Sequence, residues 1–123
     1  MNGNNVVVLF KGGRLPSWHS LDTATKNRYE QTHVDLMLSV ACERRMIRLE
    51  GYQLIDKQEY WRNFWVIEFP DLFGAETWIN AEIQPPYGAY GRFEYHFARK
   101  WVPEYLKDLV VEQPAKVFDN DHD

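Results

Sequence analysis

Hydrophobic positions follow two different periods along the chain, and these predict four strands and two helices. The continuous β-branched run at 6–10 predicts a strand that is buried on both faces and ends at the glycines that follow it. Weak alternation over 46–55 and strong alternation over 60–69 flank a polar turn, which predicts a hairpin. A last alternating stretch at 93–101 predicts the fourth strand.

Helical spacing marks the two segments between these strands. A loop containing Leu15 to His19 leads to a cap at Ser20 or Asp22, and a long helix is expected from there to about Arg45. Its buried face is predicted to carry Tyr29, His33, Leu36, Met37, Val40 and Ala41. A shorter helix starts after Pro70 and Asp71, with apolar spacing from Leu72 to Ile83. The prolines and glycines of 84–91 prevent that stretch from being helical throughout.

The order strand, helix, strand, strand, helix, strand predicts an α+β fold of the ferredoxin-like βαββαβ type. In this arrangement a four-stranded antiparallel sheet carries both helices on one face. Side-chain parity leaves apolar residues on both faces of the sheet, so a second copy is expected to cover the open face and form a homodimer, a dimeric α/β barrel. We expect the domain to span 1–103. The extension at 104–123 is predicted to hold one helical turn and a disordered polar end.

Composition supports one folded domain. The 123 residues are 45% hydrophobic and 15% aromatic, which suits a single core. A net charge of -4 with scattered Lys and Arg argues against a nucleic-acid partner. The single cysteine, Cys42, allows no intrachain disulfide, and no Cys/His spacing indicates a structural zinc site. With no apolar run long enough for a signal peptide or a membrane span, we expect a cytoplasmic protein with no membrane association.

His33 is the leading candidate for chemistry. A histidine on the sheet-facing side of a helix can exchange protons with a bound molecule near neutral pH. The structural alternative is a core histidine that hydrogen-bonds to a neighbour.

Aromatic side chains are the candidates for ligand contact. Tyr87 and Tyr90 lie in a rigid loop where their hydroxyls can donate to a carbonyl or phenolate, or where the rings simply pack a turn. Tyr95 and Trp65 lie on strands as possible walls for a flat ligand, with core packing as the alternative. Trp18, which precedes His19, is expected to line the pocket mouth. The alternative is that it anchors the loop.

A second acid-base pair is considered at Glu68 and His96, on strands that the fold brings near each other. An interface hydrogen bond or salt bridge is the alternative role for this pair. Arg48 and Glu50 on the second strand are interpreted as satisfying one another. Cys42 lies toward a helix C-terminus, where the dipole opposes a thiolate, so it is interpreted as packing.

The stretch Tyr29-Glu30-Gln31-Thr32-His33 resembles the aromatic-acidic-x-x-His element of the EthD-like branch of the dimeric α/β-barrel superfamily. In element order the resemblance extends over about 5–102. The segments Phe64 to Pro70 and Pro85 to Gly91 also resemble small barrel proteins of bacterial indole-3-acetate and aromatic-acid degradation. The superfamily resemblance implies cofactor-free oxygenases, isomerases, dehydratases and cyclases, with haem-binding and non-catalytic relatives. The chain departs from the pattern at Glu43-Arg44-Arg45 and at its Pro-Pro-Tyr-Gly loop.

Three functions follow from this sequence. The first is an enzyme that acts by acid-base chemistry, without a cofactor or metal, on an aromatic or hydrophobic metabolite in a catabolic or specialised pathway. The second is a non-catalytic accessory barrel that holds a small aromatic ligand for another enzyme. The third is a haem-binding barrel with a pocket histidine as axial ligand.

Overall fold

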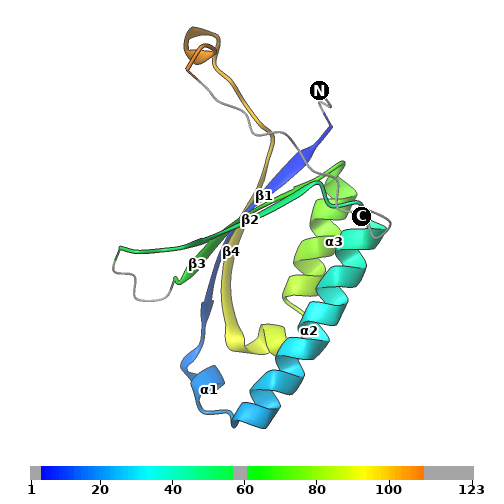
Figure 1. The fold of residues 1–123 in the computed structure, drawn as a ribbon, viewed down its shortest axis with the longest axis vertical. Helices are drawn as coiled ribbons and strands as arrows, with labels where there is room; N and C mark the ends of the chain where they lie inside the picture. The colour runs from blue at the N-terminus through cyan, green and yellow to red at the C-terminus, as the bar shows by residue number, and fades with distance from the viewer. Residues whose placement is uncertain (1–3, 57–60, 110–123) are drawn as a thin grey trace, which may run out of the picture.

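The chain forms one four-stranded sheet with two long helices on one of its faces (Figure 1). The structure is a computed structural model and describes residues 4–56 and 61–109. Its elements, in chain order, are β1 (Val6–Arg14), α1 (Pro16–His19), α2 (Thr23–Glu43), β2 (Arg48–Gln53), β3 (Asn63–Phe69), α3 (Leu72–Glu82), the 3-10 turn η1 (Tyr87–Tyr90), β4 (Gly91–Ala98) and the 3-10 turn η2 (Glu104–Leu106).

The sheet is antiparallel, with the strand order β2-β3-β1-β4. β1 lies in the interior of the sheet, where Phe10 pairs with Trp65 on one side and with Tyr95 on the other. The predicted α+β, ferredoxin-like fold is confirmed.

Both long helices begin at an aspartate cap. The Asp22 Oδ1 atom accepts the backbone N–H of Thr25 at 2.7 Å, so Asp22 rather than Ser20 caps α2. Hydrogen bonds from the Thr25 hydroxyl and backbone hold the pKa of Asp22 below its usual range. The Asp71 Oδ1 atom accepts the Gly74 N–H at 2.8 Å at the start of α3. The segment predicted as a loop before α2 contains the extra helix α1, because Pro16 stands at the first helical position.

The strands differ from the predictions at their ends. β1 does not stop at its glycines, because Gly12 pairs with Asn63 and with Phe93 across both neighbouring strands. The other three strands are shorter than the predicted 46–55, 60–69 and 93–101, and residue 60 lies outside the described residues.

The core lies between the sheet and the two long helices. α3 packs directly on β1 and β3, whereas α2 packs mainly on α3. Leu36 was predicted on the buried face of α2 but is 38% exposed. It is rotated by about 100° from Met37, which is buried. The buried residues are Val6, Val8, Phe10, Met37, Val40, Ala41, Met46, Ile67, Phe69, Ala75, Trp78, Ile79 and Ala81.

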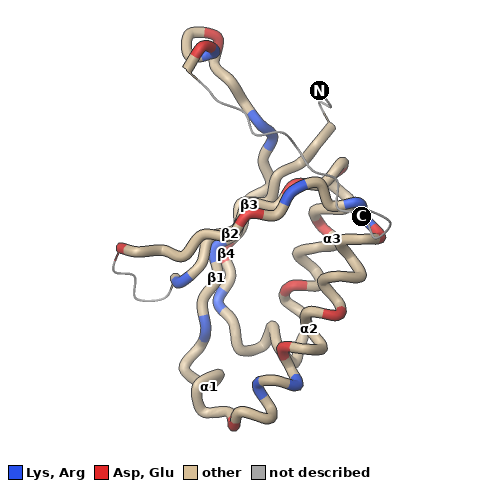
Figure 2. The backbone as a smooth tube through the Cα atoms, viewed as in Figure 1, with Lys and Arg blue, Asp and Glu red and all other residues tan. Residues whose placement is uncertain are grey.

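The open face of the sheet carries half-buried Leu9, Phe64 and Val66 among paired charges. Lys11 pairs with Glu94 at 3.6 Å. Figure 2 shows that acidic and basic residues are spread over the strands and helices rather than massed. Pairing of two copies through this face stays a prediction.

After β4 the chain leaves the sheet, and η2 lies away from the helices (Figure 1). The helical turn predicted after Pro103 is confirmed as η2. Trp101 and Tyr105 are 79% and 82% exposed in this segment. Residues 110–123, with the predicted disordered end, lie outside the described residues, and the domain boundary at 103 stays a prediction. Within 4–56 and 61–109, no helix is both long and apolar enough to span a membrane.

Candidate functional site

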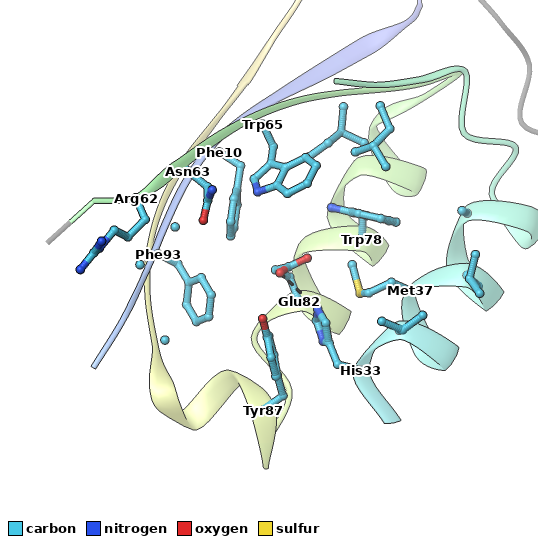
Figure 3. A pocket seen from close by; sticks show the side chains of 18 of the residues that line it. Phe10, His33, Met37, Arg62, Asn63, Trp65, Trp78, Glu82, Tyr87 and Phe93 are labelled. Atoms are coloured by element: carbon cyan, nitrogen blue, oxygen red, sulfur yellow. Dashed lines mark ion pairs between the residues drawn. The ribbon is translucent and has the colours of Figure 1, made fainter. Parts of the chain in front are cut away.

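A cavity of about 440 Å³ lies between the helix-facing side of the sheet and α2 (Figure 3). α2 packs mainly on α3, which leaves this space between α2 and the strands. Aromatic rings from β1, β3 and β4 form one wall, and Met37 and Trp78 lie opposite them. The lining residues are Phe10, Gly12, Gly13, Arg14, His33, Val34, Met37, Leu38, Ala41, Met46, Leu49, Arg62, Asn63, Trp65, Ile67, Trp78, Glu82, Tyr87, Gly91 and Phe93.

Three polar side chains from three elements meet at one end of this cavity. The His33 Nε2 atom of α2 lies 3.3 Å from the Glu82 Oε1 atom of α3, and the two side chains are only 12% and 17% exposed. The Tyr87 ring from η1 stacks on the imidazole, with ring centroids 4.0 Å apart and planes inclined by 17°. Figure 3 shows the Glu82 carboxylate and the Tyr87 hydroxyl directed toward the aromatic wall.

Burial raises the pKa of the Tyr87 phenol, and the positive charge of Arg14 partly opposes this shift. The Arg14 guanidinium lies over the Tyr87 ring at 4.6 Å and over the Trp18 ring at 4.4 Å. It also pairs with Glu30 at 3.5 Å. Tyr87 is therefore held in place as a protonated phenol that can donate a hydrogen bond.

This arrangement suits proton transfer to a ligand in the cavity. A carboxylate beside an imidazole fixes the orientation of the ring. A phenol beside the pair can donate to an oxygen on which negative charge develops. The remaining walls are mostly apolar, so a ligand would be desolvated where these groups act.

The structure places three of the predicted site residues on the cavity, namely His33, Tyr87 and Trp65. These three come from α2, η1 and β3, so only the folded chain brings them together. Their roles in ligand binding or catalysis stay predictions.

Trp18, Tyr90 and Tyr95 do not line the cavity. Trp18 is 5% exposed and packs edge-on against Tyr87 with centroids 5.5 Å apart, so it anchors η1 from behind. Tyr90 stacks on Tyr29 at 6.0 Å. Tyr95 packs on Phe97 and is 40% exposed, because neither long helix covers this part of β4.

The predicted pair of Glu68 and His96 is wrong, because β1 lies between their strands. Glu68 is 2% exposed, accepts from Asn5 at 3.0 Å and pairs with Arg48 at 3.3 Å. The His96 side chain is 72% exposed and pairs with Glu94 at 3.7 Å.

Arg48 and Glu50 form the expected ion pair at 3.4 Å on the open face. His19 is exposed in α1, and neither it nor Cys42 contributes to the cavity lining. Among the described residues, no group of three or more His, Cys, Asp or Glu side chains could hold a metal ion.

Glu82 is a residue of the candidate site that the sequence did not single out. Its signal was the same as that of His33, a titratable residue on the apolar face of a helix. Ala75, Trp78 and Ile79 are buried on α3, and Glu82 continues their spacing. Arg14 was also missed, because nothing in the sequence shows that it lies against Trp18 and Tyr87.

No family model matches the chain, and no curated protein shows significant similarity to it. Solved structures of chlorite dismutase from Candidatus Nitrospira defluvii are similar in fold. A single-site variant and the complex with imidazole each give a TM-score of 0.58 at 11% identity, and a variant in complex with cyanide gives 0.56. Each comparison covers 88% of this chain and 44% of the chlorite dismutase chain. This chain therefore spans less than half the length of these neighbours.

Proposed function

We propose that this protein binds a small, mainly hydrophobic molecule in the cavity beneath α2. It transfers a proton to or from the polar end of that molecule. The observation that carries the proposal is the meeting of His33, Glu82 and Tyr87 at one end of an aromatic cavity. A cavity of about 440 Å³ is of the size that takes a small organic ligand.

Each residue has a distinct role in this proposal. His33 accepts or returns the proton, Glu82 orients the imidazole, and Tyr87 donates a hydrogen bond to a ligand oxygen. Phe10, Trp65 and Phe93 hold the flat body of the ligand, as the wall in Figure 3 allows. The resemblance of the His33 element to EthD-like proteins supports acid-base chemistry on a metabolite, and the weaker resemblance supports an aromatic one.

A non-catalytic holder that keeps a small molecule for a partner enzyme is the second candidate, because the same aromatic wall would serve it. The two candidates differ in the role of His33. For the enzyme, His33 is a catalytic residue, whereas for the holder it contributes only to the shape of the cavity.

The test is a thermal-shift screen of aromatic acids, indoles and phenols, followed by turnover assays with the compounds that stabilise the protein. His33→Gln and Glu82→Gln test the polar end, and His19→Gln is the matched control because His19 is exposed away from the cavity. The enzyme proposal requires His33→Gln to lose turnover by about 100-fold or more while it still binds the ligand. Unchanged turnover in His33→Gln contradicts it, and binding without any turnover favours the holder.

Haem on His33, the third possibility raised by the sequence, does not fit the residues as they stand. The Nε2 atom faces Glu82 at 3.3 Å, and Figure 3 shows the carboxylate between the imidazole and the aromatic wall. Tyr87 covers one face of the imidazole ring. An axial ligand needs a ring nitrogen that points into open space, so no step of the proposed function involves haem iron.

A further inference from the structure

The cavity opens to solvent between α2 and β2 through three aliphatic side chains. Val34, Leu38 and Leu49 line the cavity and yet are 47%, 50% and 45% exposed. We call these three residues the collar. The other exposed lining residues are Arg62 and Asn63, at the start of β3.

The collar continues the apolar interior of the cavity. Val34 and Leu38 are four positions apart on α2, so they lie above one another on one side of the helix. Leu49 pairs with Ile67 across β2 and β3, and therefore points to the same side of the sheet as this buried residue. An unbroken apolar path thus runs from Ile67 to the surface.

Gly51 keeps this side of β2 free for the indole of Trp65. A Cβ atom at Gly51 would lie 2.5 Å from the Trp65 ring, so the ring covers the backbone of β2 at that point. Gly51 follows Leu49 on the same side of the strand. The indole therefore extends the apolar wall toward the collar.

The cavity has a covered polar end and an exposed apolar collar. The side chains of His33 and Glu82, at 12% and 17% exposed, are better covered than the collar. None of the collar residues is charged or polar. A molecule that contacts both the polar end at His33 and Glu82 and the apolar collar has a polar head and an apolar tail.

We propose that the ligand of this cavity is such an amphiphile, with its head at His33, Glu82 and Tyr87 and its tail leaving through the collar. The inference rests on the proposed function for the position of the head, and it adds the class of the ligand. A second copy of the chain seated on the collar is the competing explanation, and the experiment below separates the two.

The test measures the affinity of 4-n-alkylphenols of increasing chain length by isothermal titration calorimetry. Each buried methylene is worth about 0.8 kcal/mol, so affinity should rise about fourfold per methylene until the tail passes the collar. Leu38→Ser should remove this rise for the longest homologues and leave the shortest unchanged. Leu36→Ser is the matched control, since Leu36 is exposed on the same helix but does not line the cavity. His33→Gln should weaken all homologues by the same factor.

Each outcome has a defined meaning. Affinity that does not depend on chain length, or a Leu38→Ser series identical to the Leu36→Ser series, overturns the tail proposal and leaves the proposed function intact. A protein whose dimer dissociates on Leu38→Ser, with no effect on the longest homologues, has a subunit contact at the collar, which also overturns it. Absence of binding by every homologue to the folded protein, checked by circular dichroism, overturns the proposed function as well.

Discussion

Gly51→Ala tests whether the Trp65 indole is held where the cavity requires it. The new Cβ atom would lie 2.5, 2.9 and 2.9 Å from three atoms of the indole. The closest of these contacts is about 1 Å shorter than the separation of about 3.5 Å at which carbon atoms attract one another. The indole, the β2 backbone or both must therefore move.

The expected size of the effect follows from two opposing contributions. Overpacking of this kind destabilises by about 1–3 kcal/mol. Replacing glycine with alanine inside a strand gains about 0.5–1 kcal/mol, because the unfolded chain loses less freedom. We expect a net loss of about 1–2 kcal/mol in the free energy of unfolding. A ring displaced toward the cavity would also reduce its volume and weaken ligand binding.

Urea unfolding followed by circular dichroism gives the change in stability from the midpoint and slope. The control is the same substitution in a Trp65→Leu background, where the clashing ring is absent. There, Gly51→Ala should be neutral or stabilising. Stabilisation of the wild-type protein by Gly51→Ala, or an equal effect in the two backgrounds, would show that the indole does not restrict this position.

Three further predictions concern the segments that support the site. Gly88→Ala should destabilise by about 3 kcal/mol, because its Cβ atom would lie 2.3 Å from the backbone carbonyl carbon and oxygen of Ile83; urea unfolding measures this loss. Asp71→Ala should lower the free energy of unfolding by about 1 kcal/mol through loss of the cap to Gly74, and Asp71→Asn should restore most of it. Burial raises the pKa of Tyr87 above its model-compound value of 10.0, so the unfolded state ionises first and stability falls as the pH rises above that value. Tyr87→Phe should reduce this fall in unfolding experiments between pH 8 and pH 11, and an identical pH dependence in both proteins would contradict the raised pKa.

Local patterns were sufficient to predict the fold. Helical spacing placed His33 and Met37 on one face of α2, and strand alternation marked the four strands and the hairpin of β2 with β3. The end of β1 was missed because pairing on both sides carries the strand through Gly12, although glycine weakens an isolated strand.

The site was predicted only in part, because it depends on distances between segments. The pairing of Glu68 with His96 failed since parity gives the face of a strand but not its neighbours in the sheet. The aromatic character of Trp18 and Trp65 was equally clear in the sequence, yet one packs behind η1 and the other lines the cavity. Helical spacing pointed to Glu82 as directly as to His33, so this residue was within reach of the sequence.

The way α2 rests on α3 divides the chain into a part that maintains the fold and a part that can vary. The strands and α3 supply most of the core, whereas Val34 and Leu38 line the cavity and are exposed to solvent. Substitutions at these two positions should change the shape of the cavity opening while the packing of β1, β3 and α3 is left intact. Such a separation lets a protein acquire new ligands by single mutations without first losing stability, and the outer side of α2 is where selection or redesign would act first.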